Sequence, residues 1–480
     1  MITRSCLTLT LALASLLASV RGDNWPQFRG PGGSGVSSEK QQPAEWSADK
    51  NVLWKAKLAG YGWSSPVVWG DKVFLTSASS DKEGRPQGGF PGGPGGPGRG
   101  GPGGRGPGGR GSPPNIDYRW EVYCLDRATG KVLWKQLALE GKPRIAKQAA
   151  NTYATETPVT DGERVYAYFG MHGLFCYDME GKLVWKKDLG AYSTMMGQGT
   201  ASSPVLDGER LFVLVDNEEK SFLAALDCKT GDELWRVSRS ERTNHSSPII
   251  WKNNKRTELV THGAQKARAY DPATGKLLWE LSLGGMQCQA SPVGDAERLY
   301  VGISGGPGSG GFGGPGGFPG RGRGGPGGRG GMGGGGGTLY AVKAGASGDI
   351  TPKQGETTSE GIAWSQPRAA PSAASPLVYQ GYVYVVGQNG RLSCYDAATG
   401  KPAYQNQLLP GARAFWASPW ACDGKVFCLD DGGTTFVLQA GQEFKVLGKN
   451  TIDDQFWASP AVAGGSLIFR GVDHVYCIKQ

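Results

Sequence analysis

Residues 124–134 read Cys-Leu-Asp-Arg-Ala-Thr-Gly-Lys-Val-Leu-Trp, and variants of this phrase recur along the 480-residue chain. Close copies occupy residues 225–235 and 269–279, a looser copy occupies 394–404, and a shorter one occupies 176–185. In each copy an alternating apolar run ends at Asp, a Gly turn follows, and a second run carries a large aromatic residue. Asp and Thr side chains can bond the backbone amides of such a turn. The phrase therefore predicts two antiparallel strands joined by a tight connection.

A second phrase, Ser-Pro or Thr-Pro, opens each repeat. From Thr157 onward all neighbouring pairs but one lie 41 to 46 residues apart. That exception, from Ser291 to Ser375, contains the Gly-rich insertion 305–337, and the long first interval, from Ser65 to Thr157, contains the insertion 81–117. A period of roughly 40–45 residues is typical of four-stranded propeller blades. The chain is thus predicted to be all-β, an eight-bladed β-propeller of four-stranded antiparallel blades. The eight pairs begin at Ser65, Thr157, Ser203, Ser247, Ser291, Ser375, Ser418 and Ser459.

The two ends of the repeat region complement each other. The last unit, residues 458–480, lacks a Trp-bearing fourth strand, whereas residues 51–58 supply a spare one containing Trp54. We expect the N-terminal strand to complete the last blade, because closing the ring removes exposed strand edges. The propeller is accordingly assigned to residues 51–480, with residues 23–50 as a lead-in.

Residues 1–22 resemble a cleaved signal peptide. Arg4 precedes an apolar run from Leu7 to Val20, 14 residues long, which is shorter than the roughly 20 residues that a membrane-spanning helix needs. We therefore expect an exported monomer, periplasmic or extracellular, without a membrane span. The net charge is +9, but part of it lies in the signal and in the Gly-rich insertions. Nucleic acid is not an expected partner of an exported chain.

Both Gly-rich insertions are predicted between the second and third strands of their blades, the first and the fifth. Blades four apart in a ring of eight lie on opposite sides of the axis. The insertions should therefore flank one face, the face that also carries the links between blades. Gly-rich segments do not hold one conformation. Two interpretations stay open: expansion of tolerated loops, or a fringe with an adhesive or gating role.

The Ala-x-Asp-x-x-Thr-Gly-Lys-x-x-Trp phrase resembles the tryptophan-docking motif of the pyrroloquinoline-quinone (PQQ)-type propeller superfamily. The resemblance covers nearly all of residues 51–480, and Asn24-Trp-Pro-Gln-Phe-Arg-Gly-Pro31 is similar to the lead-in of many secreted bacterial members. We expect the lead-in to pack its Trp and Phe on the barrel side. The resemblance implies that each motif Trp packs against the turn glycine of a neighbouring blade. The residues concerned are Trp54, Trp134, Trp185, Trp235 and Trp279, with Gly130, Gly231 and Gly275.

The links that enter each first strand are the best candidates for a binding site. They should line the central funnel on the face with the insertions, and they combine aromatic rings, amides and a few charges. Such a mixture suits a small polar ligand or a peptide. The alternative is that these side chains fill the funnel and satisfy strand ends. The candidates are Trp63, Asn151, Tyr153, Glu156, Gln198, Arg242, Asn244, His245, Gln287, Gln289, Trp416 and Trp457.

The cysteines and histidines give no sign of a catalytic or metal centre. Cysteine alternates with Ala at one repeat position, which indicates small buried thiols, although Cys422 and Cys428 flank one hairpin turn and are a conceivable disulfide. The four histidines lack metal-ligand spacing with one another or with Cys. A lone loop histidine is usually solvated, and we expect that here.

Two functions follow from the resemblance. One is a non-catalytic binding or scaffolding module, like the BamB branch of the superfamily, with no cofactor and with a protein or a small polar ligand at the loop-rich face. The other is a PQQ-dependent dehydrogenase of alcohols or sugars. Quinoprotein alcohol dehydrogenases typically use a Glu/Asn calcium site, an Asp base and a disulfide of adjacent cysteines. Adjacent cysteines are absent, and Glu156, Asn244 and Asp454 are only available groups. The sequence favours the binding module.

Overall fold

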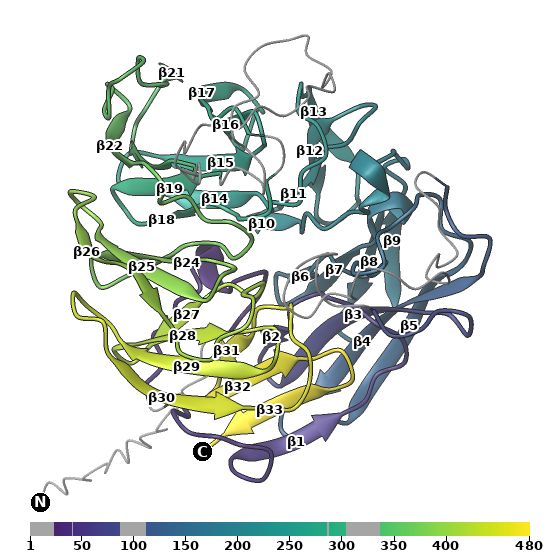
Figure 1. Ribbon diagram of the computed structural model, residues 1–480. Helices are drawn as coiled ribbons and strands as arrows, with labels where there is room; N and C mark the ends of the chain where they lie inside the picture. The colour runs from purple at the N-terminus through teal and green to yellow at the C-terminus, as the bar shows by residue number, and fades with distance from the viewer. Residues whose placement is uncertain (1–23, 41, 87–111, 286–287, 304–336) are drawn as a thin grey trace, which may run out of the picture.

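Eight antiparallel sheets stand radially around a central axis, as Figure 1 shows. The computed structural model describes residues 24–40, 42–86, 112–285, 288–303 and 337–480. Within this part of the chain, each sheet contains at least four strands, and helical structure is confined to three short 3-10 turns, η1 (Pro31–Gly33), η2 (Gly170–His172) and η3 (Met195–Gly197). The predicted eight-bladed all-β propeller is confirmed. The proposed signal peptide and most of both Gly-rich insertions lie outside the described residues.

The first four blades follow the chain from the innermost strand outward. Blade 1 contains β2 (Val67–Trp69), β3 (Lys72–Ser79), β4 (Tyr118–Asp126) and β5 (Val132–Gly141). Blade 2 contains β6 (Val159–Thr160), β7 (Arg164–Tyr168), β8 (Leu174–Asp178) and β9 (Leu183–Lys187). Blade 3 contains β10 (Val205–Asp207), β11 (Arg210–Val215), β12 (Phe222–Asp227) and β13 (Glu233–Ser238). Blade 4 contains β14 (Ile249–Lys252), β15 (Thr257–His262), β16 (Lys266–Tyr270), β17 (Leu277–Ser282) and the added β21 (Gly348–Asp349).

The remaining blades repeat the order. Blade 5 contains β18 (Val293–Gly294), β19 (Arg298–Gly302), β20 (Leu339–Lys343) and β22 (Ile362–Gln366). Blade 6 contains β23 (Leu377–Tyr379), β24 (Tyr382–Val386), β25 (Arg391–Asp396) and β26 (Pro402–Leu408). Blade 7 contains β27 (Trp420–Cys422), β28 (Lys425–Leu429), β29 (Thr434–Gln439) and β30 (Val446–Thr451). Blade 8 contains β31 (Ala461–Ala463), β32 (Ser466–Arg470), β33 (Val475–Lys479) and β1 (Val52–Ala56).

The Asp-x-x-Thr-Gly turn is held by its own side chains. Asp126 Oδ1 accepts hydrogen bonds from the backbone N–H and the hydroxyl of Thr129, at 2.8 and 2.6 Å. Gly130 closes the turn at φ +71°, a conformation that glycine adopts without a steric cost. The repeated phrase therefore specifies the connection between the third and fourth strands.

Motif tryptophans join neighbouring blades through these turns. Trp54 lies so close to Gly130 that a Cβ there would sit 2.5 Å from the indole, and its Nε1 donates to the carbonyl of Arg127 at 2.8 Å. The same arrangement recurs at four other blade junctions, and one of them, Trp364 on Gly400, was not among the sequence candidates. The other three pairs are Trp134 with Gly181, Trp185 with Gly231, and Trp235 with Gly275.

Trp279 is arranged differently from the other motif tryptophans. Its indole is completely buried, and Nε1 donates to Glu258 Oε2 of its own blade at 2.7 Å. The short strand β21 pairs in parallel with β17 at Trp279 and covers the outer edge of blade 4. The segment between β20 and β22 supplies that strand, and this replaces a turn-docking Trp at the junction to blade 5.

A ring of hydroxyl groups connects the innermost strands. The backbone N–H of Ser65 donates to Thr157 Oγ1, and that of Thr157 donates to Ser203 Oγ, at 2.9 and 3.0 Å. The same bond continues from blade to blade as far as Ser459. Because the amide before each strand-opening Pro lies outside the ladder, a hydroxyl of the next blade satisfies it. This explains physically why Ser or Thr precedes Pro in each repeat.

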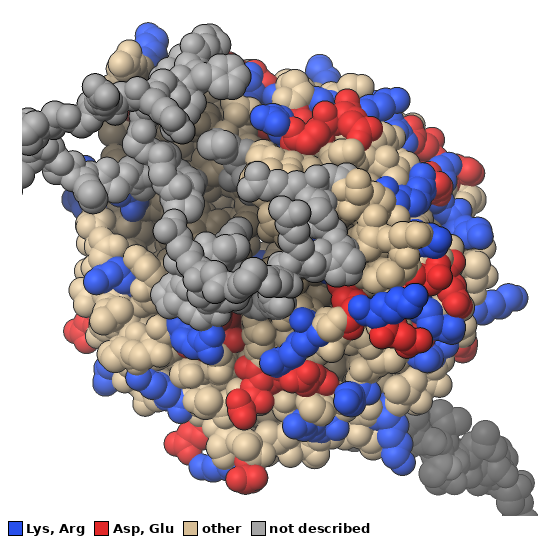
Figure 2. Space-filling model, turned by 45° about the vertical axis from the view of Figure 1, so that its right-hand side comes forward, with Lys and Arg blue, Asp and Glu red and all other residues tan. Residues whose placement is uncertain are grey.

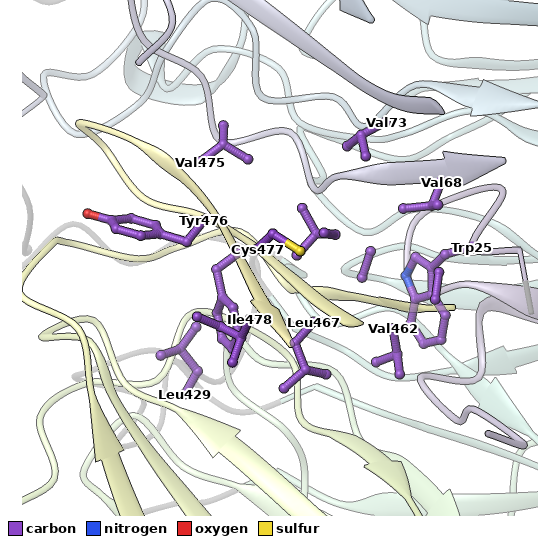
Figure 3. Packing of buried hydrophobic residues seen from close by; sticks show 14 of the residues in the cluster. Trp25, Val68, Val73, Leu429, Val462, Leu467, Val475, Tyr476, Cys477 and Ile478 are labelled. Atoms are coloured by element: carbon purple, nitrogen blue, oxygen red, sulfur yellow. The ribbon is translucent and has the colours of Figure 1, made fainter. Parts of the chain in front are cut away.

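The ring closes as predicted from the two chain ends. Strand β1 pairs with β33, with Trp54 opposite Cys477 and Ala56 opposite Val475. Figure 3 shows the core beneath this junction, where the labelled side chains of blade 8 meet those of blades 1 and 7 and the indole of Trp25. Both chain termini of the propeller thus contribute to one blade.

The lead-in was expected on the side of the barrel, and this expectation is wrong. It lies across the innermost strands. Trp25 pairs with Val68 of blade 1 through two backbone hydrogen bonds of 2.8 Å, and its side chain is 1 % exposed. Farther along, the backbone of residues 35–37 pairs with Ala421 of blade 7. The physical reason is that the inner strand edges facing the channel offer unpaired backbone groups, which the lead-in satisfies.

Two further findings concern the described residues. Cys422, Cys428 and the six other cysteines from Cys124 to Cys477 are buried and unpaired, as expected of packing thiols. None of the helices in this part of the chain is long and apolar enough to cross a membrane.

Candidate functional site

Three tryptophans from the predicted links form a continuous stack. Trp457 lies between Trp63 and Trp416, with ring centroids 5.0 and 4.4 Å apart and interplanar angles of 17° and 18°. These residues come from the links that enter blades 1, 7 and 8, which are neighbours across the closure of the ring. Trp63 is buried, whereas Trp416 and Trp457 are half-buried. The stack therefore presents aromatic surface on the face where the links gather.

Hydrogen bonds and ion pairs fix the surroundings of the stack. Trp63 Nε1 donates to the carbonyl of Ala150 at 2.9 Å. Arg413, three residues before Trp416, is exposed and pairs with the buried carboxylate of Asp431 at 3.3 Å. Burial raises the pKa of Asp431 and the Arg413 guanidinium opposes that shift. The link into blade 7 thus carries an exposed cation, held by a buried carboxylate, three residues before Trp416.

Two of the other candidates serve the structure of the link into blade 2. Asn151 donates to the carbonyl of Gln198 at 2.8 Å and accepts the hydroxyl of Thr155 at 2.6 Å. The Tyr153 hydroxyl donates to the carbonyl of Ile145 at 3.0 Å, and its ring is buried. For these residues the alternative interpretation, that side chains satisfy strand ends, describes the geometry.

Glu156 is the most unusual carboxyl group among the candidates. It is 1 % exposed, and its Oε1 has no hydrogen-bond partner among the described residues. Burial raises its pKa to about 7, while a hydrogen bond with Thr200 partly opposes the shift. A Cβ on Gly170 would sit 3.0 Å from Oε1 and 2.1 Å from Thr200 Oγ1. Gly170 therefore leaves the space that the carboxyl occupies.

A small cavity between blades 2 and 3 adjoins this carboxyl group. Its lining includes Gly170 and Thr200, which contact Glu156, together with Asp216 and Asn244. Asn244 is fully engaged: its amide donates to the carbonyl of His262 at 2.7 Å and to Asp216 at 3.3 Å, and its Oδ1 accepts the N–H of Ser246. Asn244 therefore lines this cavity, whereas Glu156 lies behind Gly170 and Thr200 and does not line it.

A buried ion-pair network next to this cavity was missed by the sequence analysis. Arg239 donates to both carboxylate oxygens of Asp216, at 2.8 and 3.0 Å, and neither side chain is exposed. Its third nitrogen donates to Thr261 and Tyr270, at 2.8 Å each. The signal was available, since Asp216 directly follows the apolar run of β11 and Arg239 directly follows β13. A charge at a strand end facing the core requires a partner.

The remaining candidates are scattered. Arg242 is exposed and pairs with Glu218 at 2.8 Å, the His245 ring bonds the carbonyl of Gly199 at 3.1 Å, and Gln289 is half-buried. Gln287 lies outside the described residues. The expectation of solvated histidines is wrong for His262, which ends β15, is 1 % exposed and bonds the carbonyl of Ala290 at 2.9 Å.

Figure 2 shows the charges around the outer strands of the face it draws. Acidic and basic side chains are intermingled there, without a continuous stripe of one sign on the described surface. The positive net charge of the chain therefore does not translate into a basic patch in this view.

The fold and the repeated docking motif place the chain among PQQ-type propellers. The sequence profile of the family described as outer membrane protein assembly factor BamB matches residues 119–302 and 335–446, which is more than half of the chain. The chain belongs to this family. No curated protein sequence matches it.

Solved structures with the same fold include both branches of the superfamily. BamB from Moraxella catarrhalis is 11 % identical, with 89 % of this chain and 97 % of that chain covered and a TM-score of 0.55. Quinohemoprotein alcohol dehydrogenase from Comamonas testosteroni is 11 % identical, with 95 % and 80 % covered and a TM-score of 0.53. Identities this low show a common fold and no more.

The quinoprotein branch raises the question of whether the residues present fit PQQ with calcium. Asn244 lines the cavity between blades 2 and 3 but Glu156 does not, and both Asn244 groups are already bonded. Asp454 lies before blade 8, where it accepts the hydroxyl of Tyr476 at 3.1 Å. Within the described residues, no group of three or more His, Cys, Asp or Glu side chains could hold a metal ion. This donor set does not match a calcium-bound quinone site.

Proposed function

We propose that this chain is a non-catalytic binding or scaffolding module outside the cytoplasm, which holds a segment of a partner protein against its link-bearing face. Residues 1–22 support export, and the family supports a binding role. A small polar ligand is the alternative occupant of the same face. The experiments below distinguish it from a segment of a protein.

The stack of Trp63, Trp457 and Trp416 carries this proposal. Indoles that are held in place before binding provide large contact area at little cost in conformational entropy. Trp457 is fixed between two parallel rings, so its exposed part is already ordered. Aromatic and Arg side chains are also the residues that most often dominate protein interfaces, and Arg413, in the same link as Trp416, has 57 % of its side chain exposed.

A peptide selection tests the proposal. Random peptides displayed on phage would be selected on the purified protein, and the enriched peptides would be measured by fluorescence anisotropy. We expect the double variant Trp416→Ala/Trp457→Ala to weaken binding at least about tenfold, as for loss of a central aromatic anchor. Leu53→Ala is the matched control, because Leu53 is an exposed apolar residue on the outer strand of blade 8. Equal affinity of the double variant and the control would refute the role of the stack.

A calorimetric titration with PQQ and calcium tests the alternative. Stoichiometric, tight binding would overturn the non-catalytic assignment and would lead to assays of alcohols and sugars with an artificial electron acceptor. Heat from a panel of small polar ligands that disappears in Trp416→Ala/Trp457→Ala, without any selected peptide, would assign the face to a small ligand instead of a protein.

A further inference from the structure

The small cavity between blades 2 and 3 belongs to the link-bearing face. Its lining comes from the links that enter blades 3 and 4 and from the connections between the second and third strands of blades 2 and 3. The centre of a water-sized sphere has about 30 Å³ in which to move, which is room for two or three water molecules or for a polar group of that size.

Tyr168, the last residue of β7, brings an unpaired hydroxyl to this cavity. Its ring packs among the buried apolar residues of blades 2 and 3, and only 3 % of the residue is exposed. The hydroxyl bonds no described residue, yet it is not completely enclosed, in contrast to the hydroxyl of Ser202 in the same lining. Because the ring is packed and Tyr168 lines the cavity, the open surface of the hydroxyl faces the cavity.

A second phenol, that of Tyr192, lies close by. Tyr192 lines the same cavity, and its hydroxyl lies over Gly190, where a Cβ would sit 2.6 Å from it. Burial raises the pKa of Tyr168, and the neighbouring Glu156 and Tyr192 raise it further. Tyr168 is therefore a neutral hydroxyl, which can both donate and accept a hydrogen bond.

The described residues offer no unpaired charge to a group in this cavity. Asp216 is the only charged residue among those that line it, and both of its carboxylate oxygens accept hydrogen bonds from Arg239. The amide of Asn244 is also fully bonded. An ionised group would lose its hydration here without gaining a counter-charge, which is strongly unfavourable.

Hydrogen bonds connect the cavity with the tryptophan stack. Trp63 Nε1 donates to the carbonyl of Ala150, and the next residue, Asn151, donates to the carbonyl of Gln198. Gln198 lies two residues before Thr200, which lines the cavity. The stack and the cavity therefore belong to one continuous surface built from links.

We propose that this cavity is a side-chain pocket for the partner segment, and that it accepts an uncharged hydrogen-bonding group: the carboxamide of Asn or Gln, or the hydroxyl of Ser or Thr. The group bonds the hydroxyl of Tyr168. Its source, a protein segment, rests on the proposed function, whereas the preference of the pocket for a neutral group does not.

Saturation-transfer NMR titrations with acetamide, the side-chain group of Asn, test the pocket. Acetate is the matched ligand, because it has a similar shape and carries a negative charge. We expect transfer to acetamide but not to acetate, and about fivefold weaker binding of acetamide to Tyr168→Phe, as for the loss of one hydrogen bond. Equal binding of acetamide to wild type and Tyr168→Phe, or equal transfer to acetate, would overturn the proposal.

Tyr166→Phe is the control variant. Tyr166 lies on the same strand and is also buried, but its hydroxyl already bonds Asp161 at 2.7 Å and the carbonyl of Cys228 at 3.3 Å. This variant should bind acetamide as the wild type does. It should also lose more stability than Tyr168→Phe, because the Tyr168 hydroxyl has no partner within the described chain to lose.

A crystal structure of the wild-type protein soaked in acetamide decides the matter even if Tyr168→Phe does not fold. Density for acetamide within hydrogen-bonding distance of the Tyr168 hydroxyl is expected. Ordered water alone at that position would overturn the proposal.

The peptides selected on the link-bearing face separate this inference from the proposed function. We expect them to share one Asn, Gln, Ser or Thr, at which Asp weakens binding at least about tenfold, because its carboxylate would be buried without a counter-charge. Peptides that require Trp416 and Trp457 but tolerate Asp at every position would overturn the pocket and leave the proposed function standing. Acetamide binding without any selected peptide would refute the partner segment instead.

Discussion

At the scale of single residues, the burial of Glu156 makes the free energy of unfolding depend on pH. Its pKa is raised from 4.5 to about 7 by burial, so the folded protein holds this proton more tightly than the unfolded chain does. Its contribution to the free energy of unfolding is therefore most favourable below about pH 4.5, and it declines as pH rises toward 7. Above pH 7 the folded state has to bury a charge, at a cost on the order of 3 kcal/mol.

Glu156→Gln should remove this pH-dependent cost. We expect the variant to gain stability relative to wild type as pH rises from about 4.5 to 7, with a constant difference above that. Urea unfolding at pH 4, 5.5 and 8 would measure it. Glu163→Gln serves as the control, because the Glu163 side chain is 77 % exposed. Parallel pH curves for wild type and Glu156→Gln would show that the carboxyl group does not titrate as the structure indicates.

Ser203 allows a test of the hydroxyl ring at one position. Its Oγ accepts the backbone N–H of Thr157 at 3.0 Å, and Ser203→Ala leaves that buried donor without a partner. A loss of about 1–3 kcal/mol in the free energy of unfolding is expected. Ser282→Ala, at an exposed serine of β17, should change stability by less than about 0.5 kcal/mol. Chemical denaturation of both variants gives the comparison.

The sequence predicts structurally important polar residues only where they belong to a repeated motif. The Ser-Pro phrase recurs, and its hydroxyls form the ring. Glu156 was named as a candidate because it lies in a link, but its unpaired oxygen depends on the space left by Gly170 of the same blade, which no local pattern indicates. Arg239 and Asp216 were missed because their pairing joins two strand ends 23 residues apart.

At the scale of elements, the junction between blades depends on a glycine beneath a tryptophan. Gly231 has φ +76°, and a Cβ there would sit 2.7 Å from the Trp185 ring. Gly208 has φ +57° with open space around it, so it shares the backbone cost but not the clash. Gly231→Ala should cost roughly 2–4 kcal/mol, against roughly 1–2 kcal/mol for Gly208→Ala.

Urea midpoints of the two glycine variants measure this difference. In the background of Trp185→Ala the clash disappears, so the two alanine substitutions should then cost about the same. An unchanged difference in that background would mean that the indole is not the reason why glycine is required at the junction.

Repeated motifs made most junctions between blades predictable from the sequence. The strand β21 was not predicted, because a two-residue strand that covers Trp279 has no periodic signature.

At the scale of the whole molecule, a single chain end closes the ring while the preceding lead-in crosses its channel. Closure was predictable by counting, because one Trp-bearing strand was missing at the C-terminus and one was spare at the N-terminus. The path of the lead-in was not predictable, because it follows from contacts with blades 1, 6 and 7 that are distant in sequence. The tryptophan stack likewise combines links from the beginning and the end of the propeller sequence.

Two nested deletions separate the effects of closure and lead-in. Removing residues 24–50 takes away the lead-in but keeps β1, whereas removing residues 24–58 also exposes the edge of β33 along Val475–Lys479. An uncovered edge strand is a template for pairing with another chain. We therefore expect the longer deletion to self-associate and the shorter one to remain monomeric at lower stability, as measured by light scattering after size-exclusion chromatography. If both deletions eluted as monomers, β1 would not be what protects the closing blade.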